Sequence, residues 1–442
     1  MAEMSFGPRM RPARGFDKKD NYLGIPGLTD PFQFLQCVVS RPPELDYGPA
    51  VVEFPNHPAK MLAVVLPDYG PPTNMKVQLC DLPKLPGGKL RPNEVLVEIH
   101  ASSVNPTDWK QRKGTLSSLC RLTLPTILGI DFSGRVVRAG DEAQFAYGEE
   151  VFGRQTIDRM REVNGTYAEY CVVDSADIFR KPLNLTHDEA AAVPQACLAA
   201  FAALSRVGRL HSGADNHDKS VLILGGSGGV GSFAIQLARH HFGCGHVVAS
   251  CSARNADLVQ SLGAHVALDY TQPNFLRSQT ARRLYNVVVD CVGGDDYWQA
   301  VRALLAPPGS GGSACGVYVT LVGSQRYLGG EAALDIAGAL QIRADYLVRQ
   351  FSHQIGAAEG YHILTGSQVR SEDLSEVARL LELGKIRPVL ARVLPLYQVV
   401  QAHEISESHH AVGKLVLQVK RGPAREEDSR GTAAASAAAA TA

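Results

Sequence analysis

Residues 221–231 read Val-Leu-Ile-Leu-Gly-Gly-Ser-Gly-Gly-Val-Gly, an apolar strand that runs directly into a glycine-rich turn. The pattern G-x-G-x-x-G falls on Gly226, Gly228 and Gly231, and residues 232–241 read as a helix. This order leaves backbone N–H groups at the positive end of a helix, where a pyrophosphate binds. The stretch therefore predicts a nucleotide site, against the alternative of a turn kept for close strand–helix packing. The predicted contacts are Gly226, Ser227, Gly228, Gly229, Val230 and Gly231.

Length and composition limit the class of protein. A chain of 442 residues is too long for one hydrophobic core and indicates two or three domains. Basic and acidic residues number 44 each, so no net charge favours nucleic acid or an anionic membrane as a partner. No apolar run is long enough for a membrane span. Nine cysteines without a C-x-x-C pair indicate reduced thiols.

The pattern of the chain changes near residue 186. Between residues 61 and 173 it alternates short apolar strands with turns, which is typical of a β-rich domain. Thr186 and Glu189 form a capping box, and strands and helices alternate after it, which predicts a parallel, doubly wound sheet. A helix follows, with one apolar face formed by Leu374, Val377, Ala378 and Leu381. The last predicted element is a strand from Lys414 to Val419.

These patterns predict an α/β protein in which the nucleotide-binding domain is inserted into the β-rich domain. The expected segments are an N-terminal extension (1–60), the first part of the β-rich domain (61–192), the nucleotide-binding domain (193–373), the C-terminal part of the β-rich domain (374–420) and a disordered tail (421–442). Basic residues near the N-terminus do not separate the cytosol from the mitochondrion, because acidic residues, Pro and Gly interrupt them.

The residues after the second strand of the nucleotide domain favour NADPH as the cofactor. NAD-specific sites place a carboxylate about 20 residues past the last glycine. Here Ser252 and Arg254 occupy that region, and no carboxylate follows until Asp257. Because guanidinium binds phosphate in a bidentate fork, Arg254 suits a ribose 2′-phosphate. The alternative is a solvated surface charge.

Several motifs in a fixed order carry a resemblance to a known family. The chain resembles the zinc-free quinone oxidoreductase (zeta-crystallin-like) branch of the medium-chain dehydrogenase/reductase superfamily, and within it the mitochondrial reticulon-interacting oxidoreductases. The resemblance covers residues 61–420 and rests on the glycine turn together with residues 104–108 (Val-Asn-Pro-Thr-Asp), 129–134, 165–170, 290–294, 318–322, 384–388 and 413–414.

The resemblance implies a GroES-like substrate domain, a Rossmann domain that binds NADPH, a homodimer and a mitochondrial location. It implies hydride transfer to a quinone or another α,β-unsaturated carbonyl. Asn105 is then expected near the nicotinamide and the substrate, and Asp108 is a second candidate catalytic residue whose alternative role is hydrogen bonding to loop amides. The cofactor contacts that the resemblance implies outside the turn are Tyr270, Val292, Leu321, Val322 and Lys414, in addition to Ser252 and Arg254, which the residues after the second strand already indicate.

Three departures from the relatives bear on the chemistry. Zinc-dependent relatives have Cys and His ligands where this chain has Asn105 and Ile130, so we expect no metal. Many enoyl-reducing relatives carry a Tyr after the position of Lys113-Gly114, and here Thr115 follows. A nicotinamide-side Thr is replaced by Ala199, which cannot donate a hydrogen bond.

Two alternatives to a quinone or enone reductase stay open. One is a non-catalytic NADPH-binding subunit that docks on a larger assembly through residues 1–60, because bound nucleotide stabilises a fold whether or not it reacts. The other is an enoyl-thioester reductase, against which the missing Tyr counts. The natural electron acceptor is not encoded in any motif of the chain.

Overall fold

The computed structural model of the protein describes residues 60–420, except 84, 86–87, 116, 118–120, 163, 278–282, 308–315, 324–343, 345–347, 349–359 and 365. The predicted docking extension (1–60, of which only Lys60 is described) and the predicted disordered tail (421–442) therefore lie outside the described residues.

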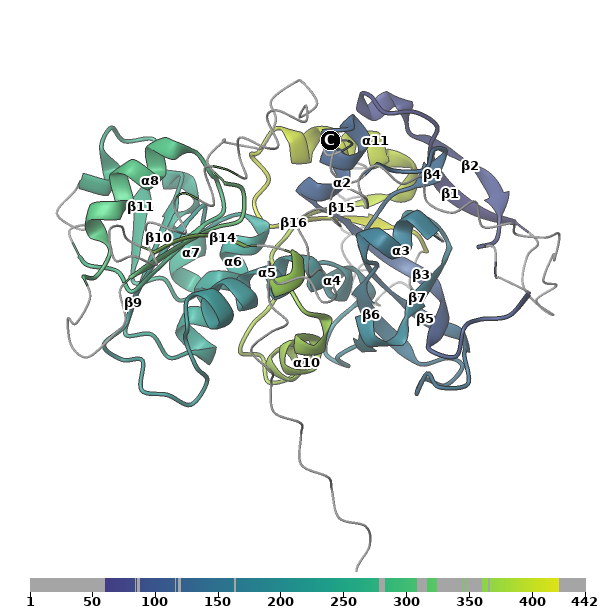
Figure 1. Cartoon of the computed structure of the whole chain (residues 1–442), viewed down its shortest axis with the longest axis horizontal. Helices are drawn as coiled ribbons and strands as arrows, with labels where there is room; N and C mark the ends of the chain where they lie inside the picture. The colour runs from purple at the N-terminus through teal and green to yellow at the C-terminus, as the bar shows by residue number, and fades with distance from the viewer. Residues whose placement is uncertain are drawn as a thin grey trace, which may run out of the picture. The chain divides into compact units, whose positions relative to one another are not determined.

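A six-stranded parallel sheet forms the nucleotide-binding half (Figure 1). Its strand order is β11-β10-β9-β12-β13-β14, so the chain reverses direction across the sheet between β9 and β12. This is the order of a Rossmann sheet, in which ligands bind at the carboxyl ends of the strands beside the reversal. The strands are β9 (Ser220–Leu224), β10 (His246–Cys251), β11 (Val266–Asp269), β12 (Val287–Asp290), β13 (Val317–Thr320) and β14 (Gly360–Ile363).

Helices cover both faces of this sheet, which explains why its central strands are continuously apolar. On one face, Val221 and Ile223 share a core with Phe233 of α6 and Val259 of α7. On the other face, Leu222 and its neighbours pack against α8. The helices of this half are α6 (Gly229–Gln236), which continues into a π-helical turn (Leu237–His241), α7 (Ala256–Ser261) and α8 (Asp295–Val301).

The β-rich half contains a second, mostly antiparallel sheet of seven strands. Its order is β15-β16-β3-β5-β6-β8, and β7 pairs with β3. Three strands in the order β2-β1-β4 form a smaller sheet. The strands are β1 (Lys60–Leu66), β2 (Lys76–Asp81), β3 (Glu94–Val104), β4 (Thr126–Ile127), β5 (Asp131–Ala139), β6 (Glu150–Arg154), β7 (Tyr170–Asp174), β8 (Ile178–Arg180), β15 (Leu390–Pro395) and β16 (Lys414–Gln418).

Strands β15 and β16 come from the end of the chain but extend the sheet of β3, so the Rossmann sheet is an insertion between parts of one sheet. The remaining helices are α2 (Pro106–Lys113), α3 (Ile157–Glu162), α4 (His187–Ala191), α5 (Pro194–Ala202), α10 (Leu374–Glu382) and α11 (Val399–Glu407). None of the described helices has the length and apolar content that a membrane crossing requires.

Most local predictions are confirmed, and the exceptions have physical reasons. The Thr186 hydroxyl accepts the Glu189 N–H at 3.2 Å, which confirms the capping box. The predicted strand over 165–173 begins only at Tyr170, because the backbone N–H groups of residues 165–167 bond to the loop at 127–129. Strands β11 and β14 were not predicted, because each has only four residues and lies at a sheet edge.

Candidate functional site

The glycine turn lies between β9 and α6, as the sequence predicts. Gly225 has a positive φ of 81°, and its N–H donates to Ser250 Oγ at 3.0 Å, while the N–H of Gly226 donates to Ser250 O at 2.7 Å. These bonds tie the turn to β10. Helix α6 begins at Gly229 with Gly228 as its N-cap, and no side chain caps it. The first amides of α6 therefore remain as donors for an anion.

The glycines of the turn are needed for two different reasons. A Cβ on Gly231 would lie 2.2 Å from the carbonyl oxygen of Gly225, and one on Gly226 would lie 2.7 Å from Ala249 Cβ, so packing within the protein excludes side chains there. A Cβ on Gly228 would meet only Gly225 O, at 3.4 Å. Within 4 Å of that Cβ position the described residues place no other atom, which fits a pyrophosphate that approaches the backbone closely.

The end of β10 carries a cation beside the turn. Asn255 Nδ2 donates to Ser252 Oγ at 3.1 Å and to Ser227 Oγ at 3.3 Å, and so connects this segment to the glycine turn. The side chain of Arg254 is exposed and has no hydrogen bond or ion pair in the described part of the chain. Asp257, the first carboxylate after Arg254, lies in the first turn of α7.

The predicted nicotinamide-side residues follow β12 and β13. The carboxylate of Asp290 accepts the N–H groups of Val292 and Gly293 at 2.9 Å each, and burial raises its pKa. A Cβ on Gly293 would lie 2.7 Å from Val322 Cβ, so the two turns lie against each other. Val292, Leu321 and Val322 are half-buried at the same sheet edge as the glycine turn.

Tyr270, another predicted contact, follows β11 at that edge. Its N–H donates to Cys251 O at 3.1 Å, and its side chain is 45% exposed. Among the described residues, the Tyr270 side chain makes no hydrogen bond or aromatic ring contact with the other predicted residues.

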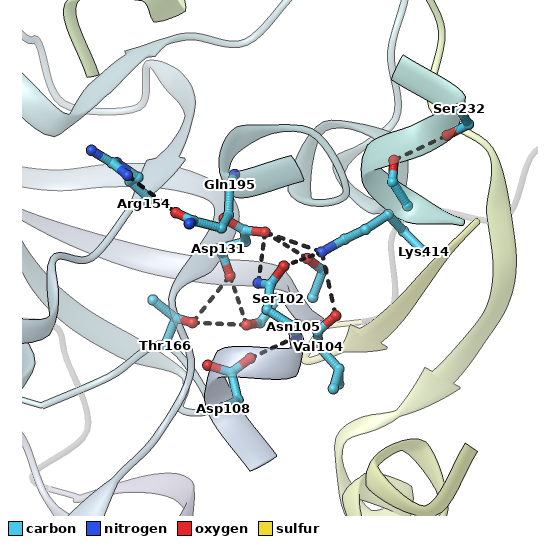
Figure 2. A network of polar contacts seen from close by, with 12 residues as sticks. Ser102, Val104, Asn105, Asp108, Asp131, Arg154, Thr166, Gln195, Ser232 and Lys414 are labelled. Carbon is cyan, nitrogen blue, oxygen red and sulfur yellow. Dashed lines mark hydrogen bonds and ion pairs between the residues drawn. The ribbon is translucent and has the colours of Figure 1, made fainter. Parts of the chain in front are cut away.

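A buried polar network lies on the β-rich side of the site (Figure 2). Lys414 Nζ donates to Asn105 Oδ1 at 2.6 Å and lies 3.3 Å from Asp131 Oδ2. Asn105 Nδ2 donates to the same Asp131 oxygen at 2.9 Å. Lys414 and Asp131 are 5% and 0% exposed, so water does not screen their interaction. The amide of Asn105 is therefore fixed in one orientation.

The network reaches the glycine turn through the start of β16. The N–H of Gly413 donates to Ser227 O at 2.9 Å, and Gly413 forms a bridge with Gly228. A Cβ on Gly229 would lie 2.9 Å from Lys414 Cδ. Lys414 thus flanks the turn with its aliphatic stem while its ammonium is bound to Asn105 and Asp131.

Asp108 lies beneath Asn105, at the first turn of α2. Its Oδ2 accepts the backbone N–H of Asn105 at 2.8 Å and the Tyr167 hydroxyl at 3.0 Å, and its Oδ1 has no partner among the described residues. Complete burial raises the pKa of Asp108 to about 7. These contacts match the alternative role of bonding to a loop amide, and a role in proton transfer stays a prediction.

The structure also bears on the two missing polar groups. Ala199 is buried in α5. The ring of Tyr69 lies against Gly114, where a Cβ would be 3.0 Å from its Cγ, and its hydroxyl accepts the Leu122 N–H at 2.9 Å. The phenol of Tyr69 thus lies at the end of α2, near the position where many enoyl-reducing relatives carry a Tyr. It comes from an earlier segment of the chain, and no sequence pattern connects that segment to this helix.

Within the described ranges, no group of three or more His, Cys, Asp or Glu side chains is arranged to hold a metal ion.

Two family models match the chain: an alcohol dehydrogenase GroES-like domain over residues 91–183 and a zinc-binding dehydrogenase over residues 262–417. Among curated proteins, the chain is 35% identical over 343 residues to "NAD(P)H oxidoreductase RTN4IP1, mitochondrial" of Mus musculus, which covers 74% of this chain and 82% of that protein. It is 31% identical over 366 residues to "2-methylene-furan-3-one reductase" of Solanum lycopersicum, over 81% of this chain and 79% of that protein.

Solved structures show the same fold. The quinone oxidoreductase from Coxiella burnetii superposes with a TM-score of 0.63 at 28% identity, over 82% of this chain and 100% of that one.

Proposed function

From the premise that this chain belongs to the medium-chain dehydrogenase/reductase superfamily, as its relatives and both matching domain models show, we propose that it is an NADPH-dependent oxidoreductase. In this proposal hydride passes to a quinone or another α,β-unsaturated carbonyl, and no metal takes part. Relatives named NAD(P)H oxidoreductase, alkenal/one oxidoreductase and quinone-oxidoreductase homolog support the substrate class.

The observation that carries the proposal is an anion site beside a fixed amide. The uncapped start of α6 and the open space at Gly228 suit a pyrophosphate. The bridge between Gly228 and Gly413 brings this turn next to the network of Asn105, Asp131 and Lys414. A dinucleotide bound at the turn would therefore have the Asn105 amide within the same site.

The residues divide the work of binding and orienting. The amides of α6 and the guanidinium of Arg254 would hold the phosphates, and Val292, Leu321 and Val322 would keep water from the nicotinamide side. The bound cofactor supplies the hydride. One N–H of Asn105 Nδ2 is used by Asp131, and the other is left to donate to a carbonyl oxygen.

In the described part of the network around Asn105, no acidic side chain is placed to donate a proton to the substrate. Asp131 accepts hydrogen bonds on both oxygens, and Asp108 is buried beneath Asn105. A quinone tolerates this arrangement, because its reduced oxygen can take a proton from water.

Purified protein with NADPH and a panel of quinones and enones should therefore consume NADPH. Binding of NADPH without turnover of any acceptor would contradict the proposal and favour the non-catalytic subunit.

Arg254→Gln is expected to weaken NADPH binding by about tenfold to a hundredfold, since a charged hydrogen bond to phosphate contributes about 1.5–3 kcal/mol. Binding of NADH should not change, because it lacks the 2′-phosphate. Isothermal titration calorimetry with both nucleotides measures this. Arg302→Gln, which removes another exposed arginine of this half, is the control. Equal losses for both nucleotides would rule out recognition of the 2′-phosphate.

The names of several relatives also support a mitochondrial location, and the family resemblance supports a homodimer. Fractionation of cells that express the full chain tests the location. Analytical ultracentrifugation of the purified protein tests the dimer.

A further inference from the structure

Asp131 joins three separate segments of the chain through one carboxylate. Its Oδ2 accepts bonds from Ser103 Oγ at 3.0 Å, Asn105 Nδ2 at 2.9 Å and Lys414 Nζ at 3.3 Å. Its Oδ1 accepts the backbone N–H of Gln195 at 2.9 Å. The donors come from the end of β3, the start of β16 and the first turn of α5.

Two of these segments lead to the nucleotide-binding half. Lys414 lies against Gly229 with its stem, and the preceding Gly413 bonds to the glycine turn. Helix α5, whose first turn is held by Asp131, packs against α6, the helix that follows the same turn. The Oδ2 of Asp131 is thus linked to the start of α6 through Lys414, and its Oδ1 is linked to α6 through α5.

We propose that Asp131 and Lys414 form a latch that fixes the Asn105 amide relative to the glycine turn, which makes both of them positioning residues for hydride transfer. The inference rests on the proposed function. It assigns the Lys414 ammonium to Asn105 and Asp131, and leaves the phosphates to the α6 amides and Arg254.

The geometry requires a carboxylate at position 131. All four of its partners are donors, three at one oxygen and one at the other. An asparagine would place its NH2 group against a donor whichever way its amide is turned. It would also leave the Lys414 ammonium without its counter-charge.

The ion pair of Asp131 and Lys414 differs from an apolar contact because it orients a neighbouring side chain, and not because it holds the segments together more strongly. A hydrophobic pair of similar size can hold two segments together as well as a buried ion pair does. It would not, however, fix the direction of the Asn105 amide, whose Oδ1 and Nδ2 are bound by Lys414 and Asp131. Loss of the latch should therefore lower the rate of hydride transfer more than it weakens nucleotide binding.

The test compares Asp131→Asn, Lys414→Met and the double variant in the full chain. Lys414→Met keeps the aliphatic stem beside Gly229 and removes only the ammonium. We expect kcat with a quinone to fall by about a hundredfold in each single variant, because a small misplacement of reacting groups has effects of that size. The Kd for NADPH should stay within about threefold, because neither replaced side chain is assigned to the phosphates. The double variant should be no slower than the slower single variant, since the two residues act as one unit.

Hydrogen exchange provides a readout that does not depend on turnover. In both single variants, amides of residues 226–232 should exchange about tenfold faster, although neither replaced residue lies in that segment. Glu94→Gln removes one carboxylate of a buried ion pair with Arg159 at the opposite end of β3, and should change neither kcat nor exchange in the turn.

Unchanged exchange in the glycine turn would overturn the latch, even in a protein that lacks turnover. Wild-type kcat in both single variants would do the same, as would a double variant whose loss is the product of the single losses. If the wild-type protein binds NADPH but reduces no acceptor, the proposed function fails. In that case hydrogen exchange in residues 226–232 still tests whether Asp131 and Lys414 form the latch.

Discussion

Gly231→Ala is expected to destabilise the nucleotide-binding half by more than about 4 kcal/mol, which is in the range reserved for severe packing defects. The added Cβ would lie 2.2 Å from Gly225 O and 2.8 Å from Gly226 Cα, and both are backbone atoms that cannot turn aside. Alanine elsewhere in a helix stabilises by about 1 kcal/mol relative to glycine, so the expected sign is opposite to that of helix propensity.

Gly228→Ala is the matched control. Gly228 has a φ of −79°, which alanine adopts without strain, and its added Cβ would meet only one atom, at 3.4 Å. Stability should fall by no more than about 1 kcal/mol. The Kd for NADPH should rise by about tenfold to a hundredfold, because the methyl group would keep the pyrophosphate from the amides.

Urea unfolding followed by circular dichroism, together with calorimetric titration of NADPH, separates the two effects. A Gly231→Ala protein of wild-type stability would show that the backbone of Gly225 and Gly226 does not exclude a side chain at position 231. A Gly228→Ala protein with wild-type affinity would show that no phosphate binds above this residue.

The second large effect is a pH dependence that Asp108→Asn should remove. Burial raises the pKa of Asp108 to about 7, from the 3.8 that is ordinary for an aspartate. The folded state therefore binds a proton that the unfolded state has lost between these values, so the contribution of this group to stability falls as the pH rises. A shift of this size corresponds to about 4 kcal/mol, present below pH ~4 and lost above pH ~7.

An asparagine fits the surroundings of Asp108 at every pH. Its carbonyl oxygen can accept from the Asn105 N–H and the Tyr167 hydroxyl, and its NH2 group takes the place of the unpartnered Oδ1. Asp108→Asn should be equal to the wild type in stability at pH 4 and more stable at pH 8. Urea unfolding at both values measures the difference, with the exposed Asp257→Asn as control.

The same variant separates the two roles of Asp108. We expect kcat to stay within about threefold of the wild type, because the side chain is fully buried and its partners among the described residues are Asn105 and Tyr167. A loss of about a hundredfold would instead identify Asp108 as a proton donor.

The sequence predicted the parts of the fold that depend on local order. Val221–Leu224, the glycine turn and the helix after it could be recognised because strand, turn and helix each have their own residue pattern. The capping box at Thr186 is likewise complete within four residues. The edge strands β11 and β14 were missed, since four residues that are only partly apolar have too little pattern to stand out.

The site was less predictable, because its contacts join residues that are far apart in the chain. Asn105 and Lys414 were both named by resemblance, but nothing in the sequence indicated that they bond to each other across 309 positions. Asp131 lies in the motif at 129–134, but its four donors come from three segments, so no single motif predicts its contacts. The backbone N–H of Gln195 has no sequence signature at all, since every residue except proline carries one.

The bond between Gly413 and the glycine turn affects how the protein is completed during synthesis. Ser227 leaves the ribosome long before its partner, because 186 residues separate them. A nascent chain can thus form the Rossmann strands before the network around Asn105 is complete. The network around Asn105 is completed only once Lys414 has been synthesised, and a chain that stops before this residue would contain the glycine turn but lack the ammonium that binds Asn105.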